Sequence, residues 1–310
     1  MPMTTAEAVR VFPTTAPAPV ASLLDRSLVF VTGKGGAGKT TVAAALGLAA
    51  AARGRRTVVC DLAGSGQLAR AYGDETRIAN RLWAVTIDPQ DALEEWLRRQ
   101  PGGAAAVAVL TRSQSFSHFV AAAPGAKELV TIGKAIDLAR PVDDPPYDLV
   151  VADGPSTGHA LGMLSAPGTL GEVARLGSVG AQARELRDFL REPGRAGFVG
   201  VSLPEEMAIE EALQLERELP AAAGRPLDLI VVNGVYPDRF SDADAEHLRR
   251  VAPRFPAARV ALAQHRRARA HAAQVARLRE QARAPVMTLP YLFVPRLGPA
   301  EYEALSRRLA

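Results

Sequence analysis

One stretch of nine residues near the N-terminus constrains this chain more than any other feature: Gly33-Lys34-Gly35-Gly36-Ala37-Gly38-Lys39-Thr40-Thr41. It fits the pattern G-x-x-x-x-G-K-[ST] and lies between a β-branched run at 27–32 and an alanine-rich stretch at 40–53. Glycines let the backbone curl so that successive N–H groups point at a phosphate, and the start of a helix adds its positive dipole end. The stretch therefore predicts a strand, a phosphate-binding loop and a helix in succession.

The loop residues divide into a backbone cradle and reactive side chains. Lys39 is expected to reach the β- and γ-phosphates of ATP, and the hydroxyl of Thr40 to bind Mg²⁺. An ordinary glycine-rich turn is the alternative, but the chain has four lysines against 33 arginines and two of the four lie here. A compact ammonium suits a curled backbone better than a planar guanidinium. The predicted nucleotide-binding residues are Gly33, Gly35, Gly36, Ala37, Gly38, Lys39, Thr40 and Thr41.

The rest of the chain alternates short β-branched runs with longer Ala/Leu/Arg/Glu stretches, the pattern of strands and crossover helices. It predicts an α/β fold with a single doubly wound, mostly parallel sheet and helices on both faces, as in P-loop NTPases. Strands are expected at 27–32, 56–60, 82–87, 147–152, 197–202, 227–232 and 285–289. Helices are expected at 40–53, 89–100, 126–138, 169–190, 205–219 and 257–283. Residues 1–24 are expected to be a disordered leader and 25–310 one ATPase domain.

Two aspartates end predicted strands and are candidates for catalysis. Asp153 closes the run 147–153 and Asp61 closes 57–61, so both are expected at the carboxyl edge of the sheet, where α/β proteins bind ligands. Phosphoryl transfer needs a carboxylate near Mg²⁺ and a group that orients the attacking water. We assign Asp153 to the Mg²⁺ site, directly or through a water. A helix cap or turn aspartate is the simpler alternative at each position.

Composition narrows the function classes. Hydrophobic residues make up 48% and charged residues 23%, and no apolar run approaches the roughly 20 residues that cross a bilayer. No signal-peptide pattern is present, so a cytoplasmic protein, peripheral to a membrane at most, is expected. The single cysteine, Cys60, excludes a disulfide or a multi-thiolate site within one chain. The net charge of +4 permits nucleic acid as a partner without requiring it.

Three motifs of the sequence belong together. The first is the loop with its extra lysine, Lys34. The second is the run Asp-Gly-Pro-Ser-Thr-Gly-His at 153–159, and the third combines Asn233 at a strand end with Pro290 and Tyr291 in a late loop. These motifs resemble the ATPases of the arsenical-pump (ArsA) and tail-anchored-protein targeting (GET) group, within the deviant-Walker-A class of MinD and ParA. The second is similar to the switch sequence Asp-Thr-Ala-Pro-Thr-Gly-His of that group, and the third to its residues that contact adenine.

The resemblance implies an ATP-hydrolysing switch that closes as a dimer on two nucleotides. Lys34 is then catalytic across the dimer, together with Lys39, Asp61 and Asp153, and Asn233, Pro290 and Tyr291 bind adenine. The dimer is either a homodimer or a pair with a paralogue. His159 is either a switch residue or a surface group at the start of a helix.

The sequence differs from the family motifs at several positions, and these differences limit which family properties we expect of this chain. The family's Asp-Pro-Ala-His after the second strand is here Asp-Leu-Ala-Gly at 61–64, which keeps only the aspartate and the alanine. With Cys60 alone, neither the zinc clip of the targeting ATPases nor the arsenic site of the pump can be built within one chain. The five methionines form no cluster that resembles a methionine-rich client helix.

Three functions remain open at this stage. The favoured one is an ArsA-type ATPase acting on a membrane protein or a hydrophobic client, with an irregular region at 101–123 as a client-contacting segment. The second is a ParA/MinD-like partition ATPase using the basic helix 265–283, although the switch sequence argues against it and that helix is more simply a solvated face. A metabolite kinase is the third. The candidate apolar client face, or ordinary core, consists of Phe116, Phe119, Leu129, Ile132, Ile136, Leu170, Val173, Leu176, Leu186 and Leu190.

Overall fold

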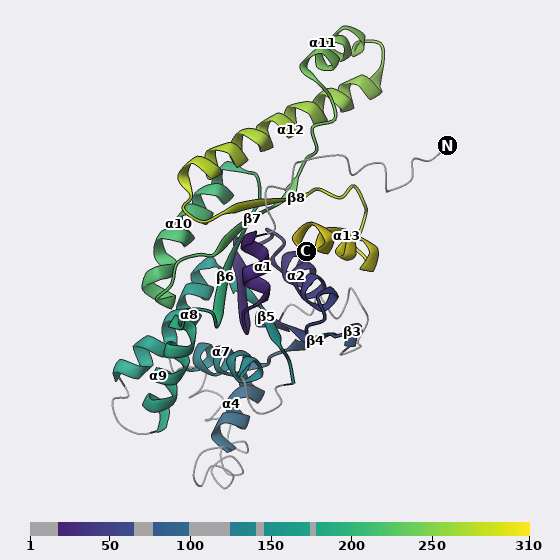
Figure 1. Ribbon diagram of the computed structural model, residues 1–310. Helices are drawn as coiled ribbons and strands as arrows, with labels where there is room; N and C mark the ends of the chain where they lie inside the picture. The colour runs from purple at the N-terminus through teal and green to yellow at the C-terminus, as the bar shows by residue number, and fades with distance from the viewer. Residues whose placement is uncertain (1–17, 65–76, 99–124, 141–145, 174–177) are drawn as a thin grey trace.

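The computed structural model describes residues 18–64, 77–98, 125–140, 146–173 and 178–310. Its centre is a sheet of eight described strands in the order β3-β4-β2-β5-β1-β6-β7-β8 (Figure 1). Neighbouring strands are parallel except for β3 and β4, which are antiparallel. The strands are β1 (Leu28–Gly33), β2 (Thr57–Asp61), β3 (Arg77–Ala79), β4 (Leu82–Thr86), β5 (Leu149–Ser156), β6 (Ala196–Ser202), β7 (Leu229–Val235) and β8 (Val286–Pro290).

Helices cover both faces of this sheet. One face carries α1 (Ala18–Leu24), α2 (Lys39–Ala52) and α13 (Pro299–Leu309), whose apolar residues form one buried cluster with the strands. The residues of the other face form a second cluster. Its helices are α4 (Pro89–Arg98), α7 (Ala126–Ala139), α8 (Thr157–Val173), α9 (Ser178–Arg191), α10 (Glu206–Ala223) and the last turns of α12 (Pro256–Gln281). The predicted doubly wound α/β fold is confirmed.

The central strands read as continuous apolar runs because both of their faces are covered. Leu28 and Phe30 of β1 belong to one cluster, whereas Val29 and Val31 belong to the other. Side chains alternate across a strand, so a strand buried on both sides needs apolar residues at every position. The neighbouring strands β5 and β6 therefore hold β1 in place, so the loop that follows β1 begins at a fixed position.

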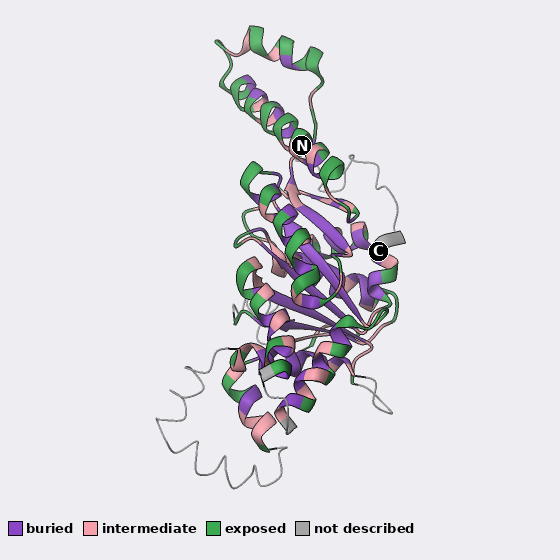
Figure 2. Cartoon of the chain, turned by 90° about the vertical axis from the view of Figure 1, so that its left-hand side faces the viewer, coloured by how far each residue is buried: buried purple, intermediate pink, exposed green. Residues whose placement is uncertain are grey.

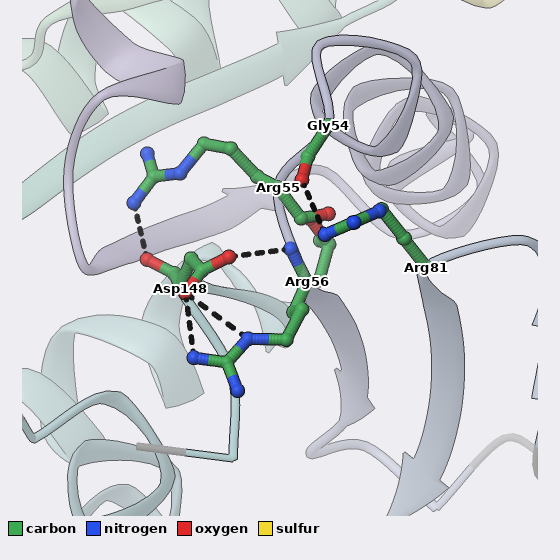
Figure 3. Close-up of polar contacts among 6 residues, drawn as sticks. Gly54, Arg55, Arg56, Arg81 and Asp148 are labelled. Carbon is green, nitrogen blue, oxygen red and sulfur yellow. Dashed lines mark hydrogen bonds and ion pairs between the residues drawn. The ribbon is translucent and has the colours of Figure 1, made fainter. Parts of the chain in front are cut away.

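A cluster of arginines around Asp148 fixes the start of β2 beside β5 (Figure 3). The Asp148 carboxylate accepts hydrogen bonds from the Arg56 backbone N–H at 2.7 Å and from its guanidinium at 3.0 and 3.3 Å. The Arg55 guanidinium donates to the Asp148 carbonyl and to the Leu24 carbonyl. Burial alone raises the pKa of Asp148, but the hydrogen bonds and charges of Arg56 and Arg55 outweigh it and lower the pKa.

All seven predicted strands are present, and one short edge strand, β3, was missed. The predicted helix at 169–190 is wrong: α8 begins twelve residues earlier, at Thr157, and α9 is a separate helix. A proline and three glycines within 158–168 obscure the helical pattern of α8 in the sequence. Two further helices, α11 (Asp242–Val251) and α13, were not predicted.

The boundary of the expected leader also needs correction. Residues 18–24 form α1, in which Val20, Leu23 and Leu24 are completely buried. Alanine and proline at 16–19 mask a short helix whose only apolar signal is these three residues. Residues 1–17 lie outside the described part, and the division into leader and domain stays a prediction.

Half of the predicted client face is core. Leu129, Ile132 and Ile136 of α7 and Leu186 and Leu190 of α9 are all at most 6% exposed and belong to the buried cluster on that face of the sheet. Leu170 is half-buried. Phe116, Phe119 and the segment 101–123 lie outside the described residues, as do Leu176 and the Val173 side chain. The apolar faces of α7 and α9 are therefore buried inside the molecule.

Helices α11 and α12 form an arm that leaves the body of the molecule (Figure 1), and its outward surfaces are mostly exposed (Figure 2). The arm is internally braced: Ser241 and Asp244 form a capping box, and His265 Nδ1 lies 3.0 Å from the Phe240 carbonyl oxygen. Ala258 and Leu262 are buried. Within the described residues, no helix is long and apolar enough to cross a membrane.

Candidate functional site

The phosphate-binding loop follows β1 directly and leads into α2. Gly33, the last residue of β1, leaves no room for a side chain, since a Cβ would lie 2.0 Å from the Val201 carbonyl oxygen of β6. Gly38 has φ 89° and precedes the first residue of α2, Lys39. Only glycine adopts this left-handed conformation without strain. The glycines thus form the tight turn that the sequence motif predicts.

Asn233, at the end of β7, braces the loop from the side. Its Nδ2 donates a hydrogen bond to the Ala37 carbonyl at 3.0 Å, and a Cβ on Gly38 would lie 2.2 Å from the same nitrogen. The structure thus places Asn233 against the phosphate loop, and its contact with adenine, implied by the resemblance, stays a prediction.

The two lysines of the loop point to different partners. The Lys39 Nζ donates to the Lys34 carbonyl at 3.4 Å, so its ammonium spans the loop. Burial lowers the pKa of Lys39, and the nearby charge of Asp153 opposes that shift. The Lys34 Nζ forms an ion pair at 2.9 Å with Glu211 of α10. Glu211 was not predicted, because a single glutamate on a surface helix carries no sequence signal.

Asp61 and Asp153 meet at the carboxyl edge of the sheet, as predicted. They are direct register partners on the adjacent strands β2 and β5, and their exposed fractions are 3% and 2%. Asp153 Oδ2 accepts a hydrogen bond of 2.6 Å from the Thr40 hydroxyl. Asp153 Oδ1 is buried and has no hydrogen-bond partner among the described residues.

The environment of Asp153 shifts its proton affinity. Burial, which is the largest effect, raises its pKa to about 6, with a further contribution from the charge of Asp61; the Thr40 hydrogen bond and Lys39 act in the opposite direction. A half-satisfied buried carboxylate beside an ammonium and a hydroxyl is a suitable place for a cation. Asp61 Oδ1 accepts from the Ala63 N–H at 3.0 Å, which orients its carboxylate.

The switch sequence at 153–159 runs from β5 into α8. The Thr32 hydroxyl of β1 donates to the Pro155 carbonyl at 2.9 Å and connects this segment to the start of the phosphate loop. The Thr157 hydroxyl is buried and has no partner among the described residues. His159 is exposed at the first turn of α8.

Tyr291, which follows Pro290, belongs to an aromatic cluster that the sequence did not reveal. The rings of Tyr236 and Tyr291 lie 4.8 Å apart, and the Phe293 ring is 5.0 Å from that of Tyr291 and 5.3 Å from that of Tyr236. Tyr291 and Phe293 are 42% and 48% exposed.

The sequence also did not predict that Tyr302 of α13 lies beside the phosphate loop, where it makes a side-chain hydrogen bond with Thr41.

Comparison with known proteins decides the family. The family model of anion-transporting ATPases, ArsA_ATPase, matches residues 26–181, half of the chain, from the start of β1 to the start of α9. This chain belongs to the ArsA ATPase family. The predicted resemblance is thereby confirmed.

Several curated relatives of this ArsA-family chain are similar over most of its length. The protein "ATPase BagA" of Mycobacterium tuberculosis is 29% identical over 231 residues, covering 70% of this chain and 67% of the relative. A "Putative arsenical pump-driving ATPase" of Halobacterium salinarum is 26% identical over 265 residues, 73% of this chain and 40% of the relative. The "ATPase GET3" of Pyricularia oryzae is 30% identical over 208 residues, 62% of this chain and 60% of the relative.

The ArsA-family site has donors that fit Mg²⁺ held together with a nucleotide. No group of three or more His, Cys, Asp or Glu side chains suited to a metal occurs among the described residues. Mg²⁺ is usually held by one or two carboxylates, substrate phosphates and water, so a full protein cage is not required. Thr40 and the unpaired oxygen of Asp153 supply the expected pair. Cys60 is buried in β2, and burial raises its pKa to about 12, so its thiol stays protonated.

Proposed function

We propose that this protein is an Mg²⁺-dependent ATPase that hydrolyses ATP to ADP and phosphate and switches between states of a dimer. One observation carries the proposal: the Thr40 hydroxyl meets one oxygen of the buried Asp153 at 2.6 Å, while the other oxygen has no partner among the described residues. This pair lies beside Lys39 at the mouth of the phosphate loop. Together they form the charged end of a nucleoside triphosphate site.

Each residue has a distinct task in this proposal. The N–H groups of 33–41 bind the phosphates, and Lys39 leaves the Lys34 carbonyl to neutralise the β- and γ-phosphate oxygens. Thr40 and Asp153 hold Mg²⁺, which supplies charge neutralisation on the phosphates when bound. Asp61 accepts a hydrogen bond from the attacking water and orients it toward the γ-phosphate. Asn233 keeps the loop in shape.

Adenine is proposed to bind beside Asn233, Pro290 and Tyr291. The exposed faces of Tyr291 and Phe293 offer an aromatic surface at this end of the site. Flat rings stack on aromatic faces with modest attraction, which suits a base that must be released after each cycle.

Lys34 is proposed to act across the dimer on the partner's nucleotide. Its ammonium is paired with Glu211 and not with its own loop. A second cation beside Lys39 within one loop adds repulsion unless it faces a separate anion. The ion pair with Glu211 is about one-third exposed on each side, so it is weak enough to be exchanged for a phosphate when the dimer closes.

We propose that the protein is a cytoplasmic ATPase and that its client is a membrane protein or a hydrophobic segment. The names of the relatives favour this class, since one is a putative arsenical pump-driving ATPase. A ParA/MinD-like ATPase would use the arginines of the basic helix to bind DNA. Arg269 and Arg277 are instead paired with carboxylates of the chain itself, and Arg267 packs over Tyr236. Nucleic acid is therefore not proposed as a partner.

Equilibrium binding of Mg²⁺-ATP to a Lys39→Ala variant tests the site. Loss of the ammonium removes a charge-assisted contact and is expected to weaken ATP binding at least tenfold, by roughly 1.5–3 kcal/mol. Lys127→Ala is the matched control, because Lys127 is an exposed lysine of α7 and its removal should leave affinity unchanged. Equal affinity of Lys39→Ala and the unmodified protein would refute the assignment.

A further inference from the structure

The arm of α11 and α12 ends in a strongly basic tip whose sequence is unusual for this chain. Between Glu246 and Glu280 no acidic residue occurs, whereas nine arginines do. Four of them lie within the short stretch 249–260, which comprises the last residues of α11, the connection and the first turn of α12. We call residues 249–260 the arm tip. Its arginines are Arg249, Arg250, Arg254 and Arg259.

Three of the five arginines nearer the body have partners on the chain, whereas Arg266, Arg279 and the four arginines of the arm tip have none among the described residues. Arg277 forms an ion pair with Glu210 of α10, and Arg269 with Asp238 and Asp242. Arg267 donates to the Tyr236 hydroxyl at 3.1 Å. These contacts explain three of the inner arginines: Arg277 joins α12 to α10, Arg269 joins α12 to the start of α11, and Arg267 joins α12 to Tyr236. The four arginines of the arm tip are exposed and have no such structural role.

Two large apolar side chains are exposed at the same place. Phe255 is 59% exposed and Val260 is 69% exposed, and both lie at the start of α12. Ala258 and Leu262 of the same helix are buried, so the helix has an inner apolar side and these two residues do not belong to it. Apolar groups that lie together at a projecting end, flanked by polar residues, are typical of a surface that contacts a membrane or another molecule.

We propose that the arm tip docks on an anionic membrane surface, with Phe255 and Val260 entering the interfacial layer and the four arginines contacting lipid phosphates. Arginine and aromatic residues together are typical of segments that lie in the headgroup region. Each arginine near an anionic surface strengthens binding by a factor of roughly five. The proposal concerns the arm and does not depend on ATP hydrolysis.

Two other binding partners for the arm tip fit the observations less well. A second copy meeting the same patch about a twofold axis would bring eight arginines together with no carboxylate in 249–260 to oppose them. Nucleic acid would use the arginines but would not need Val260 exposed beside them. An anionic lipid surface uses both the charge and the apolar side chains.

Vesicle sedimentation with the full chain tests the proposal, using phosphatidylcholine vesicles with and without phosphatidylglycerol. The unmodified protein is expected to pellet with anionic vesicles and to stay in solution with neutral ones. Changing Arg249, Arg250, Arg254 and Arg259 to Gln should weaken this binding by a factor on the order of 100 or more. The control changes Arg217, Arg266, Arg279 and Arg307 to Gln, which removes the same charge from exposed positions outside the arm tip, two of them farther along α12, and should lower binding far less.

A second readout follows the apolar contact itself. The emission of a Phe255→Trp variant should shift to the blue on anionic vesicles, relative to the unmodified protein with its two tryptophans. Thermal unfolding and nucleotide binding of the arm variants should be unchanged, which separates loss of docking from loss of fold. The proposal is overturned if the two four-arginine variants bind vesicles equally. It is also overturned if the emission of the Phe255→Trp variant does not change, if duplex DNA is bound more tightly than vesicles, or if the arm-tip variant alone loses self-association.

Discussion

At the residue scale, the decisive feature of the candidate site is the buried carboxylate of Asp153. Asp153 is 2% exposed, and one of its oxygens has no hydrogen-bond partner in the described part of the chain. Such a group costs stability in the protein without ligand and recovers it when a cation binds. In the proposed function, the cost of burying this carboxylate is recovered when Mg²⁺ and nucleotide bind.

This cost makes a prediction with a definite sign. The pKa of Asp153 is about 6 in the folded chain against 3.8 ordinarily, so the folded state holds the proton more tightly. Its stabilising contribution is fully present below about pH 4 and is lost as the pH rises through 6. Above that, the charged form costs roughly 2–3 kcal/mol. Asp153→Asn should therefore unfold at a higher temperature than the unmodified protein at pH 7.5, without nucleotide.

The same comparison at low pH provides the control. At pH 4.5 the unmodified Asp153 is already protonated, so the gain from Asp153→Asn should largely disappear. Added Mg²⁺-ATP should stabilise the unmodified protein and not the variant. A stability gain that is independent of pH between 4.5 and 7.5 would mean that the Asp153 charge is not the cause.

The residues of the phosphate site were the most predictable part of the molecule. Gly33 and Gly38 stand where a Cβ would collide with Val201 and Asn233, so the motif encodes its own local geometry. Asp61 and Asp153 were predictable because parallel strands end at one edge. Glu211, Tyr302 and the two aromatic partners of Tyr291 were not predictable, because they have no motif of their own.

At the element scale, strands were easier to predict than helices. Strands buried on both faces leave continuous apolar runs, as in β1 and β5, whereas helices of alanine and glycine such as α8 have almost no apolar periodicity. The short helix α1 and the last helix α13 are stabilised mainly by packing on the sheet and α2. That stabilisation is tertiary and leaves little trace in the local sequence.

The contacts of Asp148 give a prediction for the alignment of β2 with β5. Asp148→Ala removes hydrogen bonds from the Arg56 backbone and guanidinium, and because the carboxylate is one-third exposed the expected loss is about 1–2 kcal/mol of unfolding free energy. The pKa of Asp148 is lowered, so the loss should be present above its unfolded pKa near 4 and should shrink as the pH falls below it.

Chemical denaturation at pH 7 measures this effect against a matched surface pair. Asp188 forms an ion pair with Arg187 at 2.8 Å and is 64% exposed, so Asp188→Ala should cost less than about 1 kcal/mol. Equal losses for the two variants would show that Asp148 does not order the strands.

At the scale of the whole molecule, the proposed function needs two subunits for a complete site. If Lys34 serves the partner's nucleotide, a Lys34→Ala subunit and an Asp61→Asn subunit complement each other, because their heterodimer contains one site with both groups intact. Mixtures of the two variants should then hydrolyse ATP faster than either variant alone. Turnover equal to the weighted mean of the two at every ratio would exclude a contact across the dimer.

The measurement that tests the central claim most directly is phosphate release from Mg²⁺-ATP by the unmodified protein and by Asp61→Asn, with ATP affinity determined in parallel. An amide keeps the shape of Asp61 but not the charge that orients the attacking water. We predict unchanged ATP affinity and a turnover reduced by a factor of roughly 100 or more. Undiminished turnover in Asp61→Asn, or no phosphate release by the unmodified protein under any nucleotide and Mg²⁺ concentration, would contradict the account.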